Sequence, residues 1–277
     1  MKQYKHILYE VGEHICRITL NRPRYRNVQG IVMLNELDHA IAAADMDREV
    51  RAIVLSGAGD HFSAGHDLGT PEEVAYRTEH PLGEGTAGFF EHTWHHYIDM
   101  HLRWRNVGTP MIAAVQGYCI FGGWMVASTA DVLFAAEDAR FLGNAFQYFA
   151  IPWDIHPRRA KEMLFEGRII GAAEAQALGF VNRVVPTANL MDATMAYARD
   201  VAENDPFDMR MTKLAINQAQ DAQGFISHIK AAHSFYMVRR ISDRERGPDR
   251  APGKRRLPKV QAAMDRFERK QKQAEKQ

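Results

Sequence analysis

The sequence predicts an α/β fold followed by a helical C-terminal region. Two short, nearly continuous apolar runs, Arg51 to Ser56 and Met111 to Val115, are typical of strands buried on both faces. Val32 to Ala44, which precedes the first of these runs, has apolar residues at helical spacing. At 277 residues the chain is long enough for one large α/β domain with a helical appendage.

Composition and charge fit a soluble, globular protein. Hydrophobic residues make up 46% of the chain, charged residues 25%, and the net charge is +1. Neither nucleic acid nor an anionic membrane is therefore expected as a partner. No apolar run approaches the length of about 18 residues that a membrane helix needs, and the N-terminus lacks a signal-like apolar region. Cys16 and Cys119 lie in apolar runs without metal-ligand spacing, so buried thiols and a cytoplasmic location are expected.

The N-terminal segment is predicted to form two strands. Ile7 to Tyr9 and His14 to Leu20 have strand character and are joined at Gly12-Glu13. Asn21-Arg22-Pro23 ends the second strand, because proline fixes φ and lacks an N–H group.

A long helical insert is predicted after Asp67. Thr70 is a good N-cap, with Pro71 at the first helical position and Glu73 three residues after the cap. Residues 80–88 are rich in Gly and Pro and are expected to be loop, and residues 89–104 resume helical character.

The insert is also dense in histidine. His92, His95, His96 and His101 lack the H-E-x-x-H pattern and an obvious carboxylate partner. No metal site is therefore expected, and these side chains are predicted to lie on an amphipathic helix surface.

The stretch from Pro110 to Asp131 combines a buried strand with a glycine turn and a helix. The strand is followed by Gly117, by Gly122-Gly123 and by an apolar helical segment. Such a turn leaves backbone N–H groups at the helix start, where a developing anion can be held. Alone, the glycine pair is more simply a tight turn between core elements.

A second set of backbone donors is indicated at His61 to Leu68. This loop follows the strand Arg51 to Ser56 and a turn at residues 57–60. Its small residues Ser63, Ala64 and Gly65 let backbone N–H groups approach a ligand closely.

Taken in order, these pieces resemble the crotonase, or enoyl-CoA hydratase/isomerase, superfamily. The matching segments are Val54-Leu55-Ser56-Gly57, Phe62 to Leu68, and Ala113 to Gly117 continuing through Gly122-Gly123. Further matching segments are Ile18 to Pro23 with Asn27, Ala130 to Phe141, Ile151-Pro152, Gly167 to Ile170, and Ala175 to Val185. The resemblance covers about residues 5 to 240.

The resemblance implies a spiral core of strand–strand–helix repeats. It assigns residues 1–195 to this core, residues 196–243 to a helical trimerisation region, and residues 244–277 to a charged linker and tail. Trimers that pair into hexamers are implied, so a homo-oligomer is expected. Acidic residues dilute the basic charge of the tail, which favours a solvated or subunit-wrapping extension over nucleic-acid binding.

Further C-terminal elements are predicted from periodicity and breakers. Helical character runs from Arg158 to Leu178 with a break at Gly167, and a short strand is expected to start at Gly179-Phe180-Val181 and end at Pro186. Successive helices are expected over residues 189–202, 210–222 and 224–241, with a polar helical tail after Leu257.

The activity implied by the resemblance is chemistry on an acyl-CoA thioester. Two backbone N–H groups, from His66 and Gly122, would stabilise the enolate oxygen. Coenzyme A would be part of the substrate, so no separate cofactor is expected. The implied substrate-binding residues are Arg24, Arg26, Ala64, Asp67, Leu68, Phe121, Met125, Ala145 and Trp153. Arg22 in the same loop is also suited to a phosphate contact.

The proton-handling residues depart from the family pattern. Hydratases of the family use two glutamates, and the corresponding positions hold Met125 and Ala145, neither of which can move a proton. Asp154, two residues after Ile151-Pro152, occupies a position where some members carry a functional aspartate. Its apolar surroundings predict a raised pKa. Asp154 is equally suited to cap a helix that starts near Pro157.

Several alternatives stay open. His156, Tyr148 and Glu91 are weaker candidates for an acid partner. Hydration or isomerisation assisted by Asp154 is the leading activity, with carbon–carbon hydrolysis of a cyclic diketone as a second and a catalytically dead acyl-CoA-binding subunit as a third. The long insert suggests an enlarged lid over a bulky substrate, but the sequence does not define the acyl group.

Overall fold

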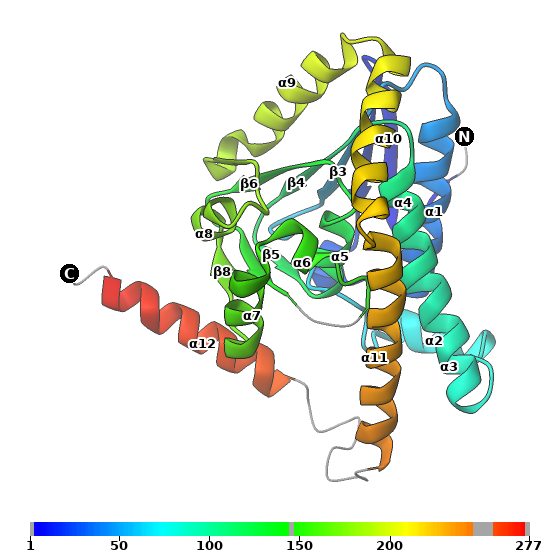
Figure 1. The fold of residues 1–277 in the computed structure, drawn as a ribbon, viewed down its shortest axis with the longest axis vertical. Helices are drawn as coiled ribbons and strands as arrows, with labels where there is room; N and C mark the ends of the chain where they lie inside the picture. The colour runs from blue at the N-terminus through cyan, green and yellow to red at the C-terminus, as the bar shows by residue number, and fades with distance from the viewer. Residues whose placement is uncertain (1–2, 144–146, 246–256, 275–277) are drawn as a thin grey trace.

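The computed structural model describes residues 3–143, 147–245 and 257–274, and the predicted α/β architecture is confirmed (Figure 1). The strands are β1 (Ile7–Gly12), β2 (Ile15–Leu20), β3 (Ala52–Gly57), β4 (Met111–Val115), β5 (Tyr118–Ile120), β6 (Val132–Ala136), β7 (Arg140–Leu142), β8 (Ile170–Gly171) and β9 (Arg183–Val185). The helices up to the centre of the chain are η1 (Pro23–Tyr25), α1 (Ile31–Met46), α2 (Pro71–Glu79), α3 (Gly85–Trp94), the π-helical η2 (His95–Asp99), α4 (Met100–Asn106) and α5 (Gly122–Ala127). The later helices are α6 (Ile151–Asp154), α7 (Pro157–Glu166), α8 (Ala172–Ala177), η3 (Thr187–Asn189), α9 (Leu190–Ala202), α10 (Pro206–Ala222), α11 (Phe225–Glu245) and α12 (Leu257–Ala274).

The main sheet has the order β1-β2-β3-β4-β6-β9. Only β1 and β2 pair antiparallel, and the other neighbours are parallel. The turn between β1 and β2 places Glu13 and His14 at positive φ, which is typical of a tight hairpin between twisted strands. Parallel pairing brings the carboxyl ends of β3, β4 and β6 to one edge, so the loops that follow them gather there.

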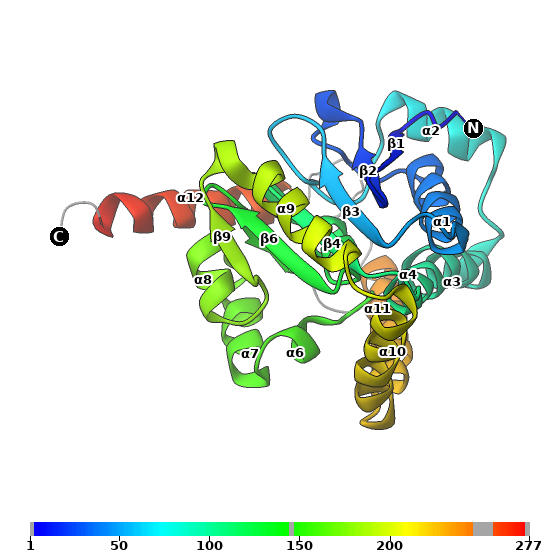
Figure 2. The same ribbon diagram turned by 90° about the horizontal axis from the view of Figure 1, so that it is seen from above.

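Helices or core cover both faces of the main sheet, which explains the continuous apolar runs. Alternate residues of each strand point to opposite faces. Ala52 and Val54 of β3 pack with α9, whereas Ile53 and Leu55 pack in the larger core. Figure 2 shows α9 lying across the sheet on the side opposite α1.

A smaller sheet, β5-β7-β8, completes the core. β4 and β6 belong to the main sheet, and the strands that directly follow them, β5 and β7, belong to the smaller one. Ser63, which follows β3, forms an isolated parallel bridge to Cys119 of β5. Ser63 is therefore to β3 what β5 is to β4, namely a following segment that pairs with the smaller sheet. Each unit thus contributes one strand to each sheet, which is the strand–strand–helix spiral that the sequence led us to expect.

The insert after Asp67 begins as predicted and then differs. Thr70 caps α2 by accepting a hydrogen bond from the backbone N–H of Glu73, with Pro71 at the first position. Helix α3 already starts at Gly85, inside the predicted loop. The long helix that follows contains the π-helical turn η2 between α3 and α4, a feature that helical periodicity does not reveal.

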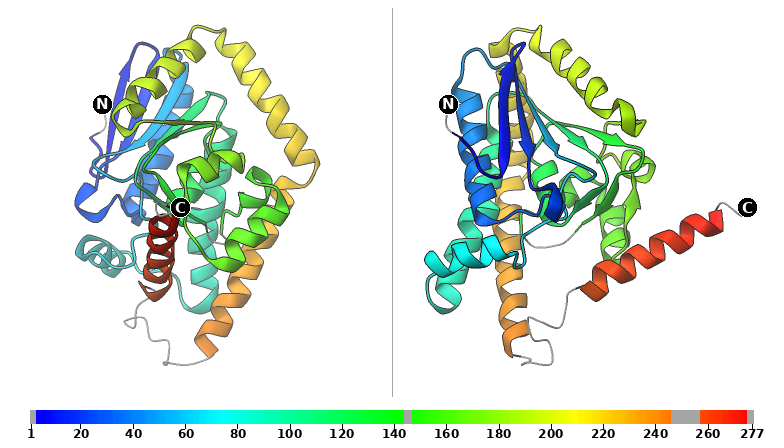
Figure 3. Two further views of the ribbon diagram at one scale, coloured as in Figure 1. Left: turned by 90° about the vertical axis from the view of Figure 1, so that its left-hand side faces the viewer. Right: turned by 180° about the vertical axis from the view of Figure 1, so that it is seen from behind.

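The C-terminal helices form a column beside the core and a separate arm (Figures 1 and 3). α10 and α11 run next to α4, and α12 lies beside the end of α7. The short strand predicted between Gly179 and Pro186 is present as β9, but it starts later than predicted, because the pairing to β6 begins only at Arg183. Among the helices of the described ranges, none is both long and apolar enough to cross a membrane.

The expectation of a solvated or subunit-wrapping tail is corrected by the contacts of α12. Ala263 of α12 is fully buried against Ile120, Leu142 and Ile169 of the smaller sheet and its surroundings. Arg266 donates to the backbone carbonyls at the end of α7. The helix is thus part of the folded chain, and apolar burial holds it there.

Candidate active site

The two glycine-containing turns meet at the edge where the parallel strands end. Ser63 donates its backbone N–H to Tyr118, and Ile120 donates back to Ser63. These bonds tie the loop after β3 to β5. A Cβ atom added at Gly65 would lie 2.7 Å from the carbonyl oxygen of Ile120 and 3.3 Å from the backbone nitrogen of Gly122. The two loops therefore pack backbone against backbone, as the sequence predicts.

Pairing with a third segment sets the backbone direction around His66. Gln29 donates to the carbonyl of Gly65 and accepts from the N–H of Asp67, both at about 2.9 Å or less. In such a parallel bridge the N–H of His66 itself takes no part in the pairing. That N–H is one of the two predicted oxyanion donors.

The second predicted donor, the N–H of Gly122, opens helix α5. Phe121 precedes it at φ 49° and ψ −103°, a strained conformation for a residue other than glycine. The N–H of Phe121 donates to Leu142 of the smaller sheet, which fixes the turn. As the first residue of the helix, Gly122 has an N–H without an intrahelical acceptor.

Side chains fill the space beside Gly122. A Cβ atom there would lie 2.7 Å from Oε1 of Gln29 and 2.8 Å from the His66 ring. The imidazole ring of His66 lies against Gly122. Its Nε2 is 2.8 Å from Oε1 of Gln147, and its face packs on Tyr97 with 4.2 Å between ring centroids.

The two positions of the family glutamates offer no acid. Met125 is buried in the main core on α5. Ala145 lies outside the described residues. The proton-transfer group must therefore come from another part of the chain.

Asp154 is a buried carboxyl group and does not cap helix α7. It is the last residue of α6, and the ring of His156 caps α7 by accepting from the N–H of Arg158. Burial raises the pKa of Asp154 to about 7, against smaller lowering effects of the Ser128 hydroxyl and the Arg105 guanidinium. Its buried Oδ2 makes no hydrogen bond to any part of the chain that the structure describes.

Tyr148 and His101 are two further buried polar side chains that interact electrostatically with Asp154 and with His66, respectively. Their rings are 5.3 Å apart. Burial, and next the charge of Asp154, raises the pKa of the Tyr148 hydroxyl. Burial lowers the pKa of His101 to about 3, and the electrostatic effect of His66 is the next cause. The four side chains thus form one interior polar group.

The placement of His101 corrects the prediction of a surface histidine. Its side chain is fully buried, and it packs on Trp104 as well as on Tyr148. The signal was present in the sequence, because Tyr97, His101 and Trp104 recur at the spacing of one helix face. His92 and His96 are only partly buried, with rings 4.4 Å apart.

The loop residues implied in binding divide into two groups. Arg22 is buried, with its guanidinium 2.8 Å from Asp67 and 2.7 Å from Glu72. The prediction of Arg22 as a phosphate contact is therefore wrong. Asp67 is 1% exposed and accepts from the N–H groups of Gly69 and Thr70, so it holds the loop and does not face a ligand.

Other implied residues are more open. Arg24 and Arg26 are exposed on the turn around Tyr25, and Leu68 is 74% exposed. Ala64 and Phe121 are partly buried beside the turns. These positions leave the two arginines available to an anionic ligand.

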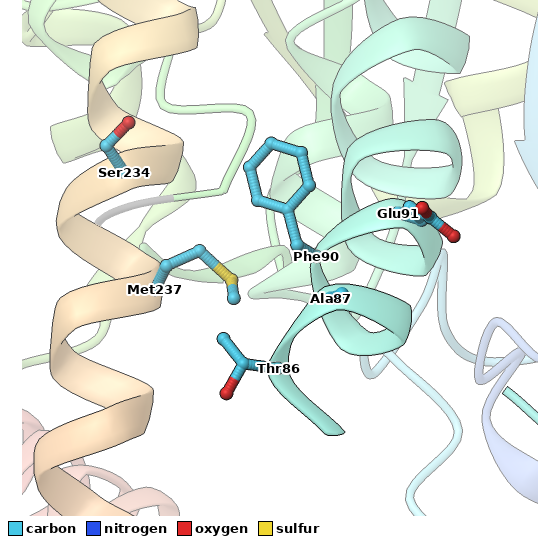
Figure 4. A pocket seen from close by; sticks show the side chains of 6 residues that line it. All are labelled: Thr86, Ala87, Phe90, Glu91, Ser234 and Met237. Carbon is cyan, nitrogen blue, oxygen red and sulfur yellow. The ribbon is translucent and has the colours of Figure 1, made fainter. Parts of the chain in front are cut away.

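The remaining candidates lie away from the turns. The indole N–H of Trp153 donates to His228 of α11 at 3.0 Å, so this side chain anchors α6. Glu91 is exposed, and Figure 4 shows it on the side of α3 that faces away from α11. A groove of about 460 Å³ separates α3 from α11 and is lined by Thr86, Ala87, Phe90, Glu91, Ser234 and Met237.

The spiral core and its converging turns define a crotonase-fold enzyme. The chain belongs to the enoyl-CoA hydratase/isomerase family, whose model matches residues 10–256. EchA13 of Mycobacterium tuberculosis, which carries a provisional enoyl-CoA hydratase name, is 38% identical over 86% of this chain and 81% of its own length.

Solved structures agree with that assignment. A probable enoyl-CoA hydratase from Mycobacterium smegmatis superposes with a TM-score of 0.77 at 39% identity, over 84% of this chain and 93% of that one. A probable enoyl-CoA hydratase from Mycobacterium thermoresistibile gives the same TM-score at 40% identity, over 84% and 94% of the two chains.

Proposed function

We propose that the protein binds an acyl-CoA thioester, stabilises its enolate with the backbone N–H groups of His66 and Gly122, and moves the α-proton with Asp154. The observation that carries this proposal is the buried Asp154 carboxyl group, whose pKa of about 7 suits both uptake and release of a proton. The enoyl-CoA hydratase names of the relatives support the substrate class. Hydration and isomerisation are the two reactions that fit both the Asp154 carboxyl group and the names of the relatives.

The electrostatic reason follows from the change of charge. A thioester carbonyl gains little from two hydrogen bonds in the ground state and much more once it becomes an oxyanion. Loss of one such donor costs about 3–4 kcal/mol in the barrier. Because the ring of His66 packs against Gly122, it has to turn aside when the carbonyl enters, which a change of side-chain rotamer achieves.

Coenzyme A is proposed to lie along the exposed turn around Tyr25. Arg24 and Arg26 are the cations available there, since the Arg22 guanidinium is paired with carboxylates. Arginine suits phosphate because its planar fork donates two hydrogen bonds at once.

The test is exchange of α-protons in deuterated water. Wild-type protein is incubated with hexanoyl-CoA and with trans-2-hexenoyl-CoA, and mass spectrometry records deuterium uptake and hydration. Asp154→Asn should lower the rate by about 10²–10⁴-fold, as expected for loss of a general acid or base. Asp200→Asn, on the exposed side of α9, serves as the matched control and should behave as wild type.

Other outcomes separate the alternatives. Absence of coenzyme A binding in calorimetry, with turnover of a cyclic diketone, would favour the carbon–carbon hydrolase. Thioester binding without any exchange would mean a non-catalytic acyl-CoA-binding subunit. Unchanged exchange in Asp154→Asn would eliminate Asp154 as the proton carrier.

A further inference from the structure

The interior beside the proposed reaction site contains polar atoms that an alkyl acyl chain could not hydrogen-bond. The Oη atom of Tyr148 and both ring nitrogens of His101 are buried, and none of the three makes a well-formed hydrogen bond to a residue of the described ranges. The His101 ring has a weaker contact with the backbone carbonyl of His96, which raises its pKa against the larger effect of burial. Buried polar atoms in folded proteins nearly always have partners, so each exception needs an explanation. Two such side chains in ring contact point to a common cause.

Their location connects them to the substrate. His66, whose ring lies against Gly122, contributes electrostatically to the lowered pKa of His101. The charge of Asp154 contributes to the raised pKa of Tyr148. The His66 ring also packs on Tyr97, one helical turn before His101, and His101 is in ring contact with Tyr148. These rings form a continuous contact from the loop of the first proposed donor to the segment that precedes Asp154, beside the place proposed for the acyl group.

We propose that the acyl group of the natural substrate carries a neutral oxygen, a ketone or a hydroxyl group, that hydrogen-bonds to Tyr148 and His101. This inference rests on the proposed thioester function and names its substrate class. A plain alkyl chain would add no partner to these three buried polar atoms, whereas one ligand oxygen can pair with the phenol and with an imidazole nitrogen.

The charges nearby favour a neutral group over a carboxylate. His101 is uncharged because its burial disfavours the imidazolium. The nearest guanidinium, Arg105, already binds Asp221 and Gln220 at 3.1 and 2.9 Å. A carboxylate on the ligand would thus meet the like charge of ionised Asp154, and the one guanidinium that acts on Asp154 among the described residues is already engaged.

The experiment compares matched thioesters by calorimetry. The probes are hexanoyl-CoA, 4-oxohexanoyl-CoA, 5-oxohexanoyl-CoA and adipoyl-CoA, which share a six-carbon acyl chain. At least one keto ester should bind about 10- to 100-fold more tightly than hexanoyl-CoA and adipoyl-CoA, the range expected when an unpaired buried group gains its partner.

Two substitutions locate the preference. Tyr148→Phe and His101→Phe remove the polar atoms and keep an aromatic ring, and each should reduce the keto preference to less than about a third of its wild-type value. Tyr197→Phe, on α9 against the other face of the sheet, is the matched control and should keep it. Thermal midpoints check folding, and Tyr148→Phe should match or exceed wild type because it removes an unpartnered buried hydroxyl group.

The outcomes are distinct. Equal binding of hexanoyl-CoA and both keto esters, with α-proton exchange intact, would overturn this inference and leave the proposed function standing. Tightest binding of adipoyl-CoA would overturn the preference for a neutral oxygen. A keto preference that survives in both phenylalanine variants would remove Tyr148 and His101 as its source. Failure of every thioester to bind or exchange would overturn the proposed function and this inference with it.

Discussion

In the proposed mechanism Asp154 acts as acid and as base within one turnover, because its pKa lies near neutral pH. A pair of glutamates in related hydratases divides these two tasks, and Met125 can perform neither. At the scale of single residues, the structure removes the competing role of Asp154, since His156 caps the following helix.

The pH dependence of catalysis gives a direct prediction. If ionised Asp154 abstracts the proton, the exchange rate should rise about tenfold per pH unit below pH 7 and level off above it. Asp154→Asn should show no such limb in its residual rate. A flat wild-type profile between about pH 5 and pH 8, measured at saturating thioester, would contradict the assignment.

Stability should change with pH in the opposite direction. The folded protein keeps the Asp154 proton up to about pH 7, whereas an unfolded aspartate releases it near pH 4. Between these values the folded state binds more protons, so this group lowers the free energy of unfolding as pH rises. Asp154→Asn should therefore stabilise the protein at pH 8 more than at pH 5, by a few kcal/mol at most. Urea unfolding at both pH values measures the difference, and a larger gain at pH 5 would refute the sign.

Single residues also show where sequence reasoning stops. The oxyanion loops were predictable because glycine at position 122 and small residues at 63–65 report directly on backbone approach. Asp154 was predictable from its apolar neighbours. The lack of well-formed hydrogen bonds from Tyr148 and His101 to the described residues was not predictable from the sequence. It depends on which side chains from distant segments bury these atoms and on whether those side chains can hydrogen-bond them, and no local pattern reports this.

At the scale of elements, a buried carboxylate joins helix α2 to the start of α1. Glu73 does not close a capping box, because Asp67 takes the N–H of Thr70. Its Oε2 instead accepts the N–H of Ile31 at the start of α1, and its Oε1 pairs with Arg77. Glu73→Gln should lower the free energy of unfolding by about 1–3 kcal/mol. The exposed Glu79→Gln should stay within about 0.5 kcal/mol of wild type in the same denaturation experiment.

Helix α12 offers a second test at this scale. Ala263 is fully buried under the helix, whereas its neighbour Ala262 is exposed. Ala263→Asp places a carboxylate in that contact and should release α12, seen as faster limited proteolysis after residue 245 and a thermal midpoint several degrees lower. Ala262→Asp should cleave at the wild-type rate. Equal cleavage of both variants would show that this contact does not hold the helix.

Elements with strong local signals matched their predictions. The cap of α2, the strands β3 and β4 and the helices α9 to α11 follow from caps, apolar runs and breakers. The helix η2 and the start of the strand Arg183–Val185 do not, because a π-helical turn and an edge pairing to β6 are decided by packing.

At the scale of the whole molecule, the spiral core followed from the ordered motifs and not from any single one. The assembly remains a prediction. The column formed by α10 and α11 exposes large apolar side chains: Phe207, Met211, Leu214, Ile216, Phe235 and Val238. Exposed apolar surface of this kind marks interfaces in oligomers. We expect light scattering to give three or six times the 31.5 kDa chain mass, and a monomer at micromolar concentration would contradict that expectation.

The buried guanidinium of Arg22 has a mechanical consequence for the whole molecule. It donates hydrogen bonds to the carbonyl of Val28, to the carboxylate of Asp67 and to side chains at the start of α2. One guanidinium therefore connects three separate segments of the chain. Because Arg22 binds both Asp67 and the start of α2, α2 cannot move as a rigid unit unless these hydrogen bonds break or Asp67 moves with it. Displacement of α2 would therefore also disturb the backbone next to the proposed donor at His66, so the position of the insert and the geometry of the proposed donor pair are coupled.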